Sequence, residues 1–155
     1  EARLAVGGIR LEVIGEGPEK GALRTLATDL GMESSVAFRG RVSDEGLVDA
    51  YRRATVLASA SISEGWGMTI TEAAACGTPA VVTDISGHRD AVRDGHSGLL
   101  ADGPPDLAAR LIEVVGDPGR RAALSAGAIL MAARFDWDRT ATEAFRVLAS
   151  TAGGQ

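Results

Sequence analysis

The chain has 155 residues, the usual length of one domain, and is long enough to bury a hydrophobic core. Its 16 basic and 21 acidic residues give a net charge of −5, which argues against a protein that binds nucleic acid through a basic surface. No apolar run approaches the length of a membrane span, and the N-terminal residues show no signal-peptide pattern. The single cysteine, Cys76, excludes an internal disulfide framework and a cysteine-based zinc site. We therefore expect one soluble, cytoplasmic domain over residues 1–155.

Short apolar runs alternate with segments of helical spacing along most of the chain. Strands are predicted over residues 10–14, 36–39, 56–58, 80–83 and 97–101. Helices are predicted over residues 19–30, 44–54, 69–76, 106–115, 120–134 and 137–150, with Ser43 and Asp136 as N-caps and Gly31 as a C-cap. This alternation predicts an α/β fold, a Rossmann-like parallel sheet with helices on both faces.

The start of the chain does not fit such a sheet. Residues 1–8 have the pattern of a helix end, whereas a doubly wound sheet begins with a strand that lies near its middle. We expect the sequence to begin part-way into a domain and the sheet to lack its first strand. The neighbouring strands would then have unpaired edges, which favour domain swapping or aggregation.

The segment most informative about chemistry is SEGWGMTITE, residues 63–72. Two carboxylates, Glu64 and Glu72, stand eight residues apart around a glycine-rich turn that opens a helix. Glycines allow the backbone to approach a ligand closely, and the free N–H groups of a helix start suit a diphosphate. Glu72 is placed to accept both hydroxyls of a ribose, and Glu64 to reach a group beyond the diphosphate, such as a hexose. Taken alone, the same pattern is also typical of two solvated carboxylates near a helix cap.

The order of the surrounding motifs resembles the donor-binding domain of retaining glycosyltransferases with the GT-B architecture, family 4 type. Its Glu-x7-Glu hallmark, with an aromatic residue between two glycines, is present from Glu64 to Glu72. The other similar segments are residues 11–18, with Gly-x-Gly-Pro after a strand, and residues 38–42, 72–82, 94–100 and 135–137. The resemblance covers about residues 10–150.

This resemblance implies binding of a nucleotide diphosphate sugar and retaining transfer of a hexosyl group to an acceptor hydroxyl. It implies Glu64 as the catalytic residue beside the transferred sugar, and Glu72 as the ribose ligand. The other implied donor-binding residues are Gly65, Trp66, Gly67, Met68, Thr69, Arg41, Val42, Gly15 and Gly17. Arg41 and Val42 would border the base, and Gly15 and Gly17 would face the phosphates. The alternative is a stand-alone, non-catalytic nucleotide-sugar-binding module that acts with a separate acceptor-binding chain.

One departure from the family concerns charge. The phosphate-binding Arg and Lys of the family have no counterpart here, and Lys20 is expected on a helix surface. The phosphates would be met by the helix end and by basic side chains, so no cofactor and no metal are expected. The N-terminal acceptor domain is absent from these 155 residues, so we expect no sugar transfer by this chain alone. Any peripheral membrane association would come through that absent domain.

A few further residues have simple interpretations. His88 either contacts the donor or acceptor or has a loop or helix-capping role, and His96 is expected in a turn. Neither histidine has an acidic pair at metal-ligand spacing. Trp137 and Phe145 have helical spacing and are predicted to lie in the core. Cys76 is expected to pack as a small apolar side chain.

Overall fold

The computed structural model describes residues 8–152. Its strands are β1 (Leu11–Ile14), β2 (Val36–Gly40), β3 (Leu57–Ser59), β4 (Ala80–Thr83) and β5 (Gly98–Ala101). Its helices are α2 (Lys20–Asp29), α3 (Asp44–Arg53), α4 (Met68–Ala75), α5 (Ser86–Ala91), α6 (Pro104–Gly116), α7 (Pro118–Ala132) and α8 (Trp137–Ala152), with a 3-10 turn over Glu33–Ser35. Every predicted strand and helix is confirmed within two residues at each end; α5 was not predicted.

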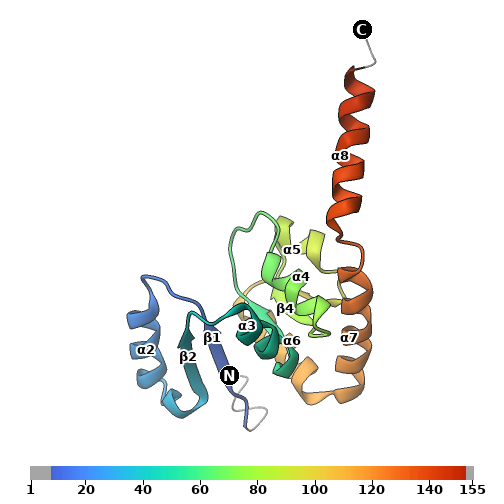
Figure 1. The fold of residues 1–155 in the computed structure, drawn as a ribbon. Helices are drawn as coiled ribbons and strands as arrows, with labels where there is room; N and C mark the ends of the chain where they lie inside the picture. The colour runs from blue at the N-terminus through green and yellow to red at the C-terminus, as the bar shows by residue number, and fades with distance from the viewer. Residues whose placement is uncertain (1–7, 153–155) are drawn as a thin grey trace.

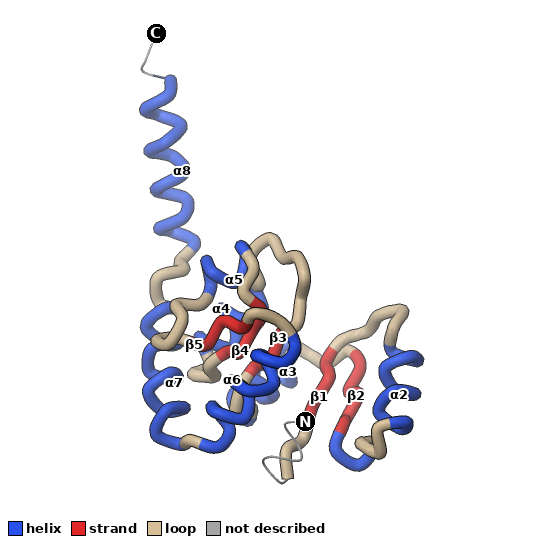
Figure 2. Tube along the Cα trace, turned by 180° about the vertical axis from the view of Figure 1, so that it is seen from behind, coloured by secondary structure: helices blue, strands red, loops and turns tan. Residues whose placement is uncertain are grey.

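The strands form two parallel sheets instead of one continuous sheet. β1 pairs with β2, and β3, β4 and β5 pair in that order. Figures 1 and 2 show a lobe of α2, β1 and β2 beside a larger lobe, with β1 on the side nearer to it. Within the described residues no ladder joins β1 to β3. A doubly wound sheet has its first strand at this place in the order. The helix end expected at the start of the chain lies, apart from Gly8, outside the described residues.

The three-stranded sheet is covered on both faces. Successive residues of β4 point to opposite sides, so Val81 faces one helix layer while Ala80 and Val82 face the other. Val81 packs with Leu99, Ala101, Leu107, Val114 and Leu124, which brings α6 and α7 onto one face. Ala80 and Val82 pack with Ile70, Ala91 and Val92, which brings α4 and α5 onto the other. The glycine-rich segment of residues 63–72 belongs to this larger lobe, whose central sheet is buried between the two helix layers.

Helix α8 corrects one prediction from the sequence. It projects away from both lobes (Figure 1), and Trp137 and Phe145, predicted to be core residues, are 85% and 72% exposed. Helical spacing identifies an apolar face but does not show what covers it, and no part of the described chain covers this one. The cap itself is confirmed, because the Asp136 carboxylate accepts from the Asp138 N–H at 3.0 Å. Among the described helices, none has the length and apolar character that crossing a membrane requires.

Candidate functional site

The glycine-rich segment leaves the carboxyl end of β3 and enters α4. Ligands of parallel α/β sheets bind at this edge. Gly67, the residue before α4, has a φ of 71°, and a Cβ there would lie 2.9 Å from Ile70 Cδ1. Both facts require a glycine, because other residues rarely adopt a positive φ and a side chain would collide with Ile70. The loop therefore enters the helix through a sharp turn that presents its backbone.

The first turn of α4 has backbone N–H groups that no described residue accepts from. No side chain caps this helix and no acidic residue stands in its first turn. The Ile70 N–H donates to the Gly67 carbonyl oxygen at 2.9 Å, but the amides of Met68 and Thr69 find no acceptor among the described residues. Met68 and Trp66 are exposed, so solvent or a ligand can reach this turn. Such a helix start attracts an anion.

Glu64 lies in the loop before this helix start, with its side chain exposed. Its Oε1 accepts a hydrogen bond from the Ser61 hydroxyl at 2.9 Å. The backbone of Glu64 rests directly on α5, where a side chain at Gly87 would collide with the Glu64 carbonyl oxygen. The carboxylate is thus held by a neighbouring hydroxyl, and the loop is supported from beneath by a helix.

Glu72 projects from α4 and has a partner that sequence reasoning missed. Its Oε2 accepts from the hydroxyl of Tyr51 at 2.9 Å. Tyr51 is a buried residue of α3, and burial together with the hydrogen bond to Glu72 raises the pKa of its phenol. The phenol is therefore a protonated donor at physiological pH. The two residues are 21 apart in the chain, so only the packing of α3 against α4 reveals the pair.

Trp66 also has a distant partner. Its ring makes an edge-to-face contact with Phe135, with centroids 5.0 Å apart and an interplanar angle of 88°. Phe135 lies in the link between α7 and α8, so this contact joins the glycine-rich loop to the C-terminal part of the chain. Such a geometry is favourable for aromatic pairs. Sequence analysis placed both residues in motifs but did not pair them.

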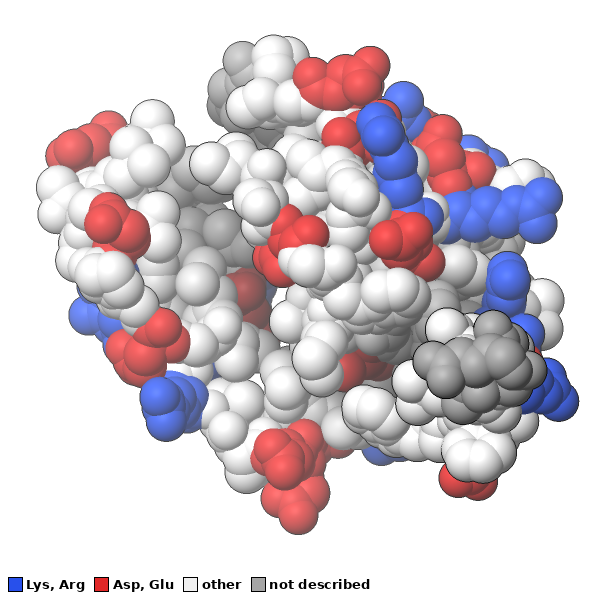
Figure 3. Space-filling model, turned by 90° about the horizontal axis from the view of Figure 1, so that it is seen from above, with Lys and Arg blue, Asp and Glu red and all other residues white. Residues whose placement is uncertain are grey.

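The two predicted turns of the smaller lobe contact each other. The Gly15 N–H donates to the Gly40 carbonyl oxygen at 2.8 Å, so this amide already has an acceptor. Gly17 has open space around it, and Arg41 and Val42 are exposed after β2. These turns belong to a different lobe from Glu64. Figure 3, which looks onto the upper end of Figure 1, shows a hollow between the lobes, with basic side chains gathered mainly on the right-hand side of the view.

The structure shows where Lys20 and the two histidines lie. Lys20 Nζ pairs with Glu16 Oε1 at 2.7 Å on the surface of α2, as expected. His96 lies in a turn, as expected. His88, in contrast, is inside α5 and only 1% exposed, which corrects the loop or capping role and leaves little of its ring accessible to a ligand. Helix α5 has six residues, too few for an apolar period to show in the sequence.

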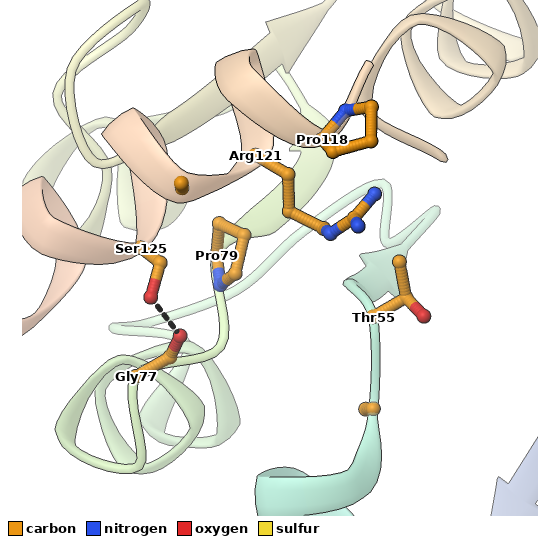
Figure 4. A pocket seen from close by; sticks show the side chains of 8 residues that line it. Thr55, Gly77, Pro79, Pro118, Arg121 and Ser125 are labelled. Atoms are coloured by element: carbon orange, nitrogen blue, oxygen red, sulfur yellow. Dashed lines mark hydrogen bonds between the residues drawn. The ribbon is translucent and has the colours of Figure 1, made fainter. Parts of the chain in front are cut away.

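Two surface hollows of the described chain lie away from the glycine-rich segment. One of about 270 Å³ lies between α7 and the segments before β3 and β4; Thr55, Pro79 and Arg121 are among its lining residues (Figure 4). It is at the amino ends of these strands, opposite to the edge that carries Glu64, and a second hollow of about 250 Å³ lies at the amino ends of β1 and β2. Neither contains a predicted site residue. Among residues 8–152 no group of three or more His, Cys, Asp or Glu side chains is arranged to hold a metal ion.

Comparison with known proteins identifies the family. A model of the family described as glycosyl transferases group 1 matches residues 3–131. The chain belongs to this family. Among its curated relatives are proteins named D-inositol 3-phosphate glycosyltransferase. The one from Acidothermus cellulolyticus is 47% identical over 124 residues, which are 79% of this chain and 27% of the relative. The one from Streptomyces bingchenggensis is 40% identical over 139 residues, covering 88% of this chain and 30% of the relative. The chain thus spans less than a third of the length of these two relatives.

Solved structures agree on the fold. Sucrose-phosphate synthase from Thermosynechococcus elongatus matches with a TM-score of 0.85 and 22% identity, over 99% of this chain and 41% of that one. The Anabaena protein HepE, in complex with UDP and glucose, matches with a TM-score of 0.83 and 25% identity, over 95% of this chain and 42% of HepE. The predicted fold class is confirmed: parallel strands flanked by helices, as in the C-terminal domains of GT-B glycosyltransferases.

Proposed function

We propose that this chain is the donor-binding part of a retaining glycosyltransferase, which binds a nucleotide diphosphate sugar and transfers its hexosyl group to an acceptor hydroxyl. The observation that carries the proposal is the uncapped start of α4, with unpaired amides at Met68 and Thr69, between two carboxylates at the carboxyl edge of the sheet. Family membership supports it, as does the UDP and glucose in the HepE complex.

The residues then have distinct roles. Glu64 contacts hydroxyls of the donor sugar, and Glu72, oriented by Tyr51, accepts from the ribose hydroxyls. Backbone donors from Gly65 to Thr69, including those of Trp66, Gly67 and Met68, take the diphosphate and the sugar. Arg41 and Val42 border the base. Of the two glycines after β1, Gly17 is the better candidate for a phosphate contact, because the Gly15 amide is already bonded to Gly40.

In the proposed reaction, the protein stabilises the negative charge that develops on the leaving diphosphate. In front-face transfer, the bond from the sugar to the diphosphate breaks while the acceptor oxygen bonds to the same face, and the leaving diphosphate takes the acceptor proton. Negative charge then builds up on the β-phosphate, opposite the start of α4. Removal of one such preorganised donor costs about 10²–10³ in rate in other enzymes. This helix end and basic side chains neutralise the phosphates, and we propose that neither a cofactor nor a metal is needed.

The acceptor site belongs to the rest of the protein. The chain spans less than a third of its curated relatives, so we propose that an N-terminal domain or partner subunit binds the acceptor and that this chain alone transfers no sugar. The relatives are named for D-inositol 3-phosphate, so a phosphorylated cyclitol is the acceptor to test first. We propose a cytoplasmic location, where nucleotide sugars are available.

Calorimetric titration without metal tests the donor site. The chain is titrated with UDP-glucose, GDP-mannose and ADP-glucose, together with Glu72→Ala and, as a control, Glu113→Ala on α6. We expect one base class to bind, Glu72→Ala to raise its Kd about tenfold or more, and Glu113→Ala to leave it unchanged. Binding of none of the three by a folded chain, or equal binding by Glu72→Ala, would contradict the proposal.

A further inference from the structure

A chain of hydrogen-bonding groups, two serine hydroxyls and one backbone N–H, leads from the Glu64 carboxylate into the interior of the larger lobe. Ser61 donates to Glu64 Oε1 at 2.9 Å, and the Ser61 and Ser59 hydroxyl oxygens are 3.2 Å apart. The Ser61 N–H also donates to Ser59 Oγ, at 3.5 Å. Ser59 Oγ lies 3.5 Å from Nε2 of His88; this contact is long, but within the described residues Nε2 has no other hydrogen-bond partner. The exposed carboxylate is thus connected to a buried ring.

The ring of His88 is fixed at its other nitrogen. Nδ1 lies 2.7 Å from the carbonyl oxygen of Thr83, at the end of β4. A carbonyl oxygen only accepts, so we assign the proton to Nδ1, and in the neutral ring Nε2 is then the acceptor for the Ser59 hydroxyl. The Ser59 hydroxyl has one proton, so in this arrangement Ser59 is linked to Ser61 by the Ser61 N–H, which donates to Ser59 Oγ. Thr83 contributes a second anchor, because its hydroxyl donates to the Ser61 carbonyl oxygen. His88 and the loop are therefore attached to the same end of the central strand.

Helix α5 also contacts the loop on either side of Trp66. Next to His88, Gly87 lies against the carbonyl oxygen of Glu64 so closely that no side chain fits between them. His88 Cδ2 lies 3.4 Å from the place that a Cβ on Gly67 would take. The loop is consequently supported from Ser59 to Gly67 by one short helix.

We propose that His88 is a positioning residue for Glu64. It holds Ser59 in place and, through Ser59 and Ser61, keeps the Glu64 carboxylate oriented toward the hydroxyls of the donor sugar. Without this support, an exposed glutamate on a glycine-rich loop would lose rotamer freedom on binding, which weakens the contact. The inference rests on the proposed function, because it assigns Glu64 to the sugar and not to the nucleotide.

A purely structural role for His88 predicts something different. A buried ring that only fills space lowers the stability when it is replaced, but leaves the relative affinity for sugar and nucleotide unchanged. The ratio of Kd for UDP to Kd for UDP-glucose therefore separates the two roles, with GDP and GDP-mannose, or ADP and ADP-glucose, in their place if that base class binds. UDP alone cannot contact Glu64 through a sugar.

The test uses three variants. His88→Asn keeps a donor for the Thr83 carbonyl but cannot reach Ser59, and Ser59→Ala breaks the chain while leaving the ring intact. Ser125→Ala is the matched control, because Ser125 also hydrogen-bonds a loop, through the Gly77 carbonyl oxygen at 2.6 Å, at the opposite end of the sheet. We expect the ratio to fall about tenfold in His88→Asn and in Ser59→Ala, with little further loss when both are combined, and no change in Ser125→Ala.

A second readout needs no ligand. The carboxyl carbon resonance of Glu64, followed by NMR, should move in both His88→Asn and Ser59→Ala while that of Glu72 stays in place. If the ratio and the Glu64 resonance are unchanged in folded variants, His88 does not position Glu64 and the proposed function still stands. If no nucleotide pair binds, or Glu72→Ala has no effect, the proposed function fails. The inference about the donor sugar then fails with it, whatever the resonance shows of the contact.

Discussion

At the scale of single residues, the two carboxylates of the motif differ in how they are held. Glu64 accepts from a serine hydroxyl on its own loop, whereas Glu72 accepts from a buried phenol on another helix. The spacing of the two glutamates was predictable because it is local. The partners Tyr51, Ser59 and His88 were not predicted, because their contacts span 21 to 29 residues of chain and depend on tertiary packing.

Replacement of Tyr51 by Phe tests whether the phenol orients Glu72. The ring volume is kept and only the hydrogen bond is lost, so we expect the Kd of the nucleotide to rise about three- to tenfold. Thermal unfolding and calorimetry on the same sample separate lost binding from lost stability. An unchanged Kd would show that Glu72 needs no orienting partner.

The same residue predicts how stability depends on pH. The folded state raises the pKa of Tyr51 above its usual value of 10.0, by burial first and by Glu72 second. In the unfolded chain the phenol loses its proton near pH 10, so the stability it contributes is complete below that pH and is lost as pH rises further. Tyr51 is the single tyrosine of the chain, so tyrosinate absorbance reads its titration directly. Urea unfolding should show a loss in wild type above pH 10 that Tyr51→Phe lacks; parallel losses would contradict it.

At the scale of elements, α5 was the helix that sequence analysis did not find. Longer helices were found because they repeat apolar residues over several turns and begin with caps, as α3 does at Ser43, whose side chain accepts from the Gly46 N–H. Helix α5 has six residues, among them Gly87, Arg89 and Asp90. It is specified by contact with the loop above it and the sheet beside it, which no local pattern records.

Gly87→Ala should therefore disturb the Glu64 loop, because it changes how α5 packs against that loop. The new Cβ would meet the Glu64 carbonyl oxygen, so either the loop or α5 must shift. We expect a loss of about 1–3 kcal/mol in the free energy of unfolding and weaker binding of the nucleotide sugar. The control is Gly21→Ala, which enters open space in α2 and should stabilise by up to about 1 kcal/mol without changing binding. Melting curves and calorimetry of both variants check this, and wild-type behaviour of Gly87→Ala would show that the contact can relax freely.

At the scale of the molecule, the order of strands and helices along the chain was predictable. Which apolar faces and strand edges are covered was not. The alternation of strands and helices predicted the α/β class and parallel strands, and both are confirmed, although the strands form two sheets and not one. Within the described residues β1 and β3 are not paired, and the absence of a first strand from the sequence stays a prediction. Trp137 and Phe145, on the exposed apolar face of α8, were predicted to be buried, because periodicity does not distinguish a face that packs from a face that is left open.

The break makes a prediction about self-association. β1 and β3 each have an edge that no described strand pairs with, and an unpaired edge is a template for another chain. We expect the molecule to associate with rising concentration, as measured by analytical ultracentrifugation. Ala58, in the middle of β3, is exposed, so Ala58→Lys should reduce association at little cost in stability, since lysine is a natural edge-blocking residue.

A control variant separates the effect of blocking the strand edge from the effect of adding a positive charge. Ala123→Lys adds the same charge at an exposed position of α7, away from either edge, and should associate as wild type does. If both variants dissociate equally, general repulsion and not the strand edge explains the effect. A wild-type chain that stays monomeric over the whole range and melts cooperatively would mean that side-chain packing alone protects these edges, and that the two lobes are stable without a strand between them.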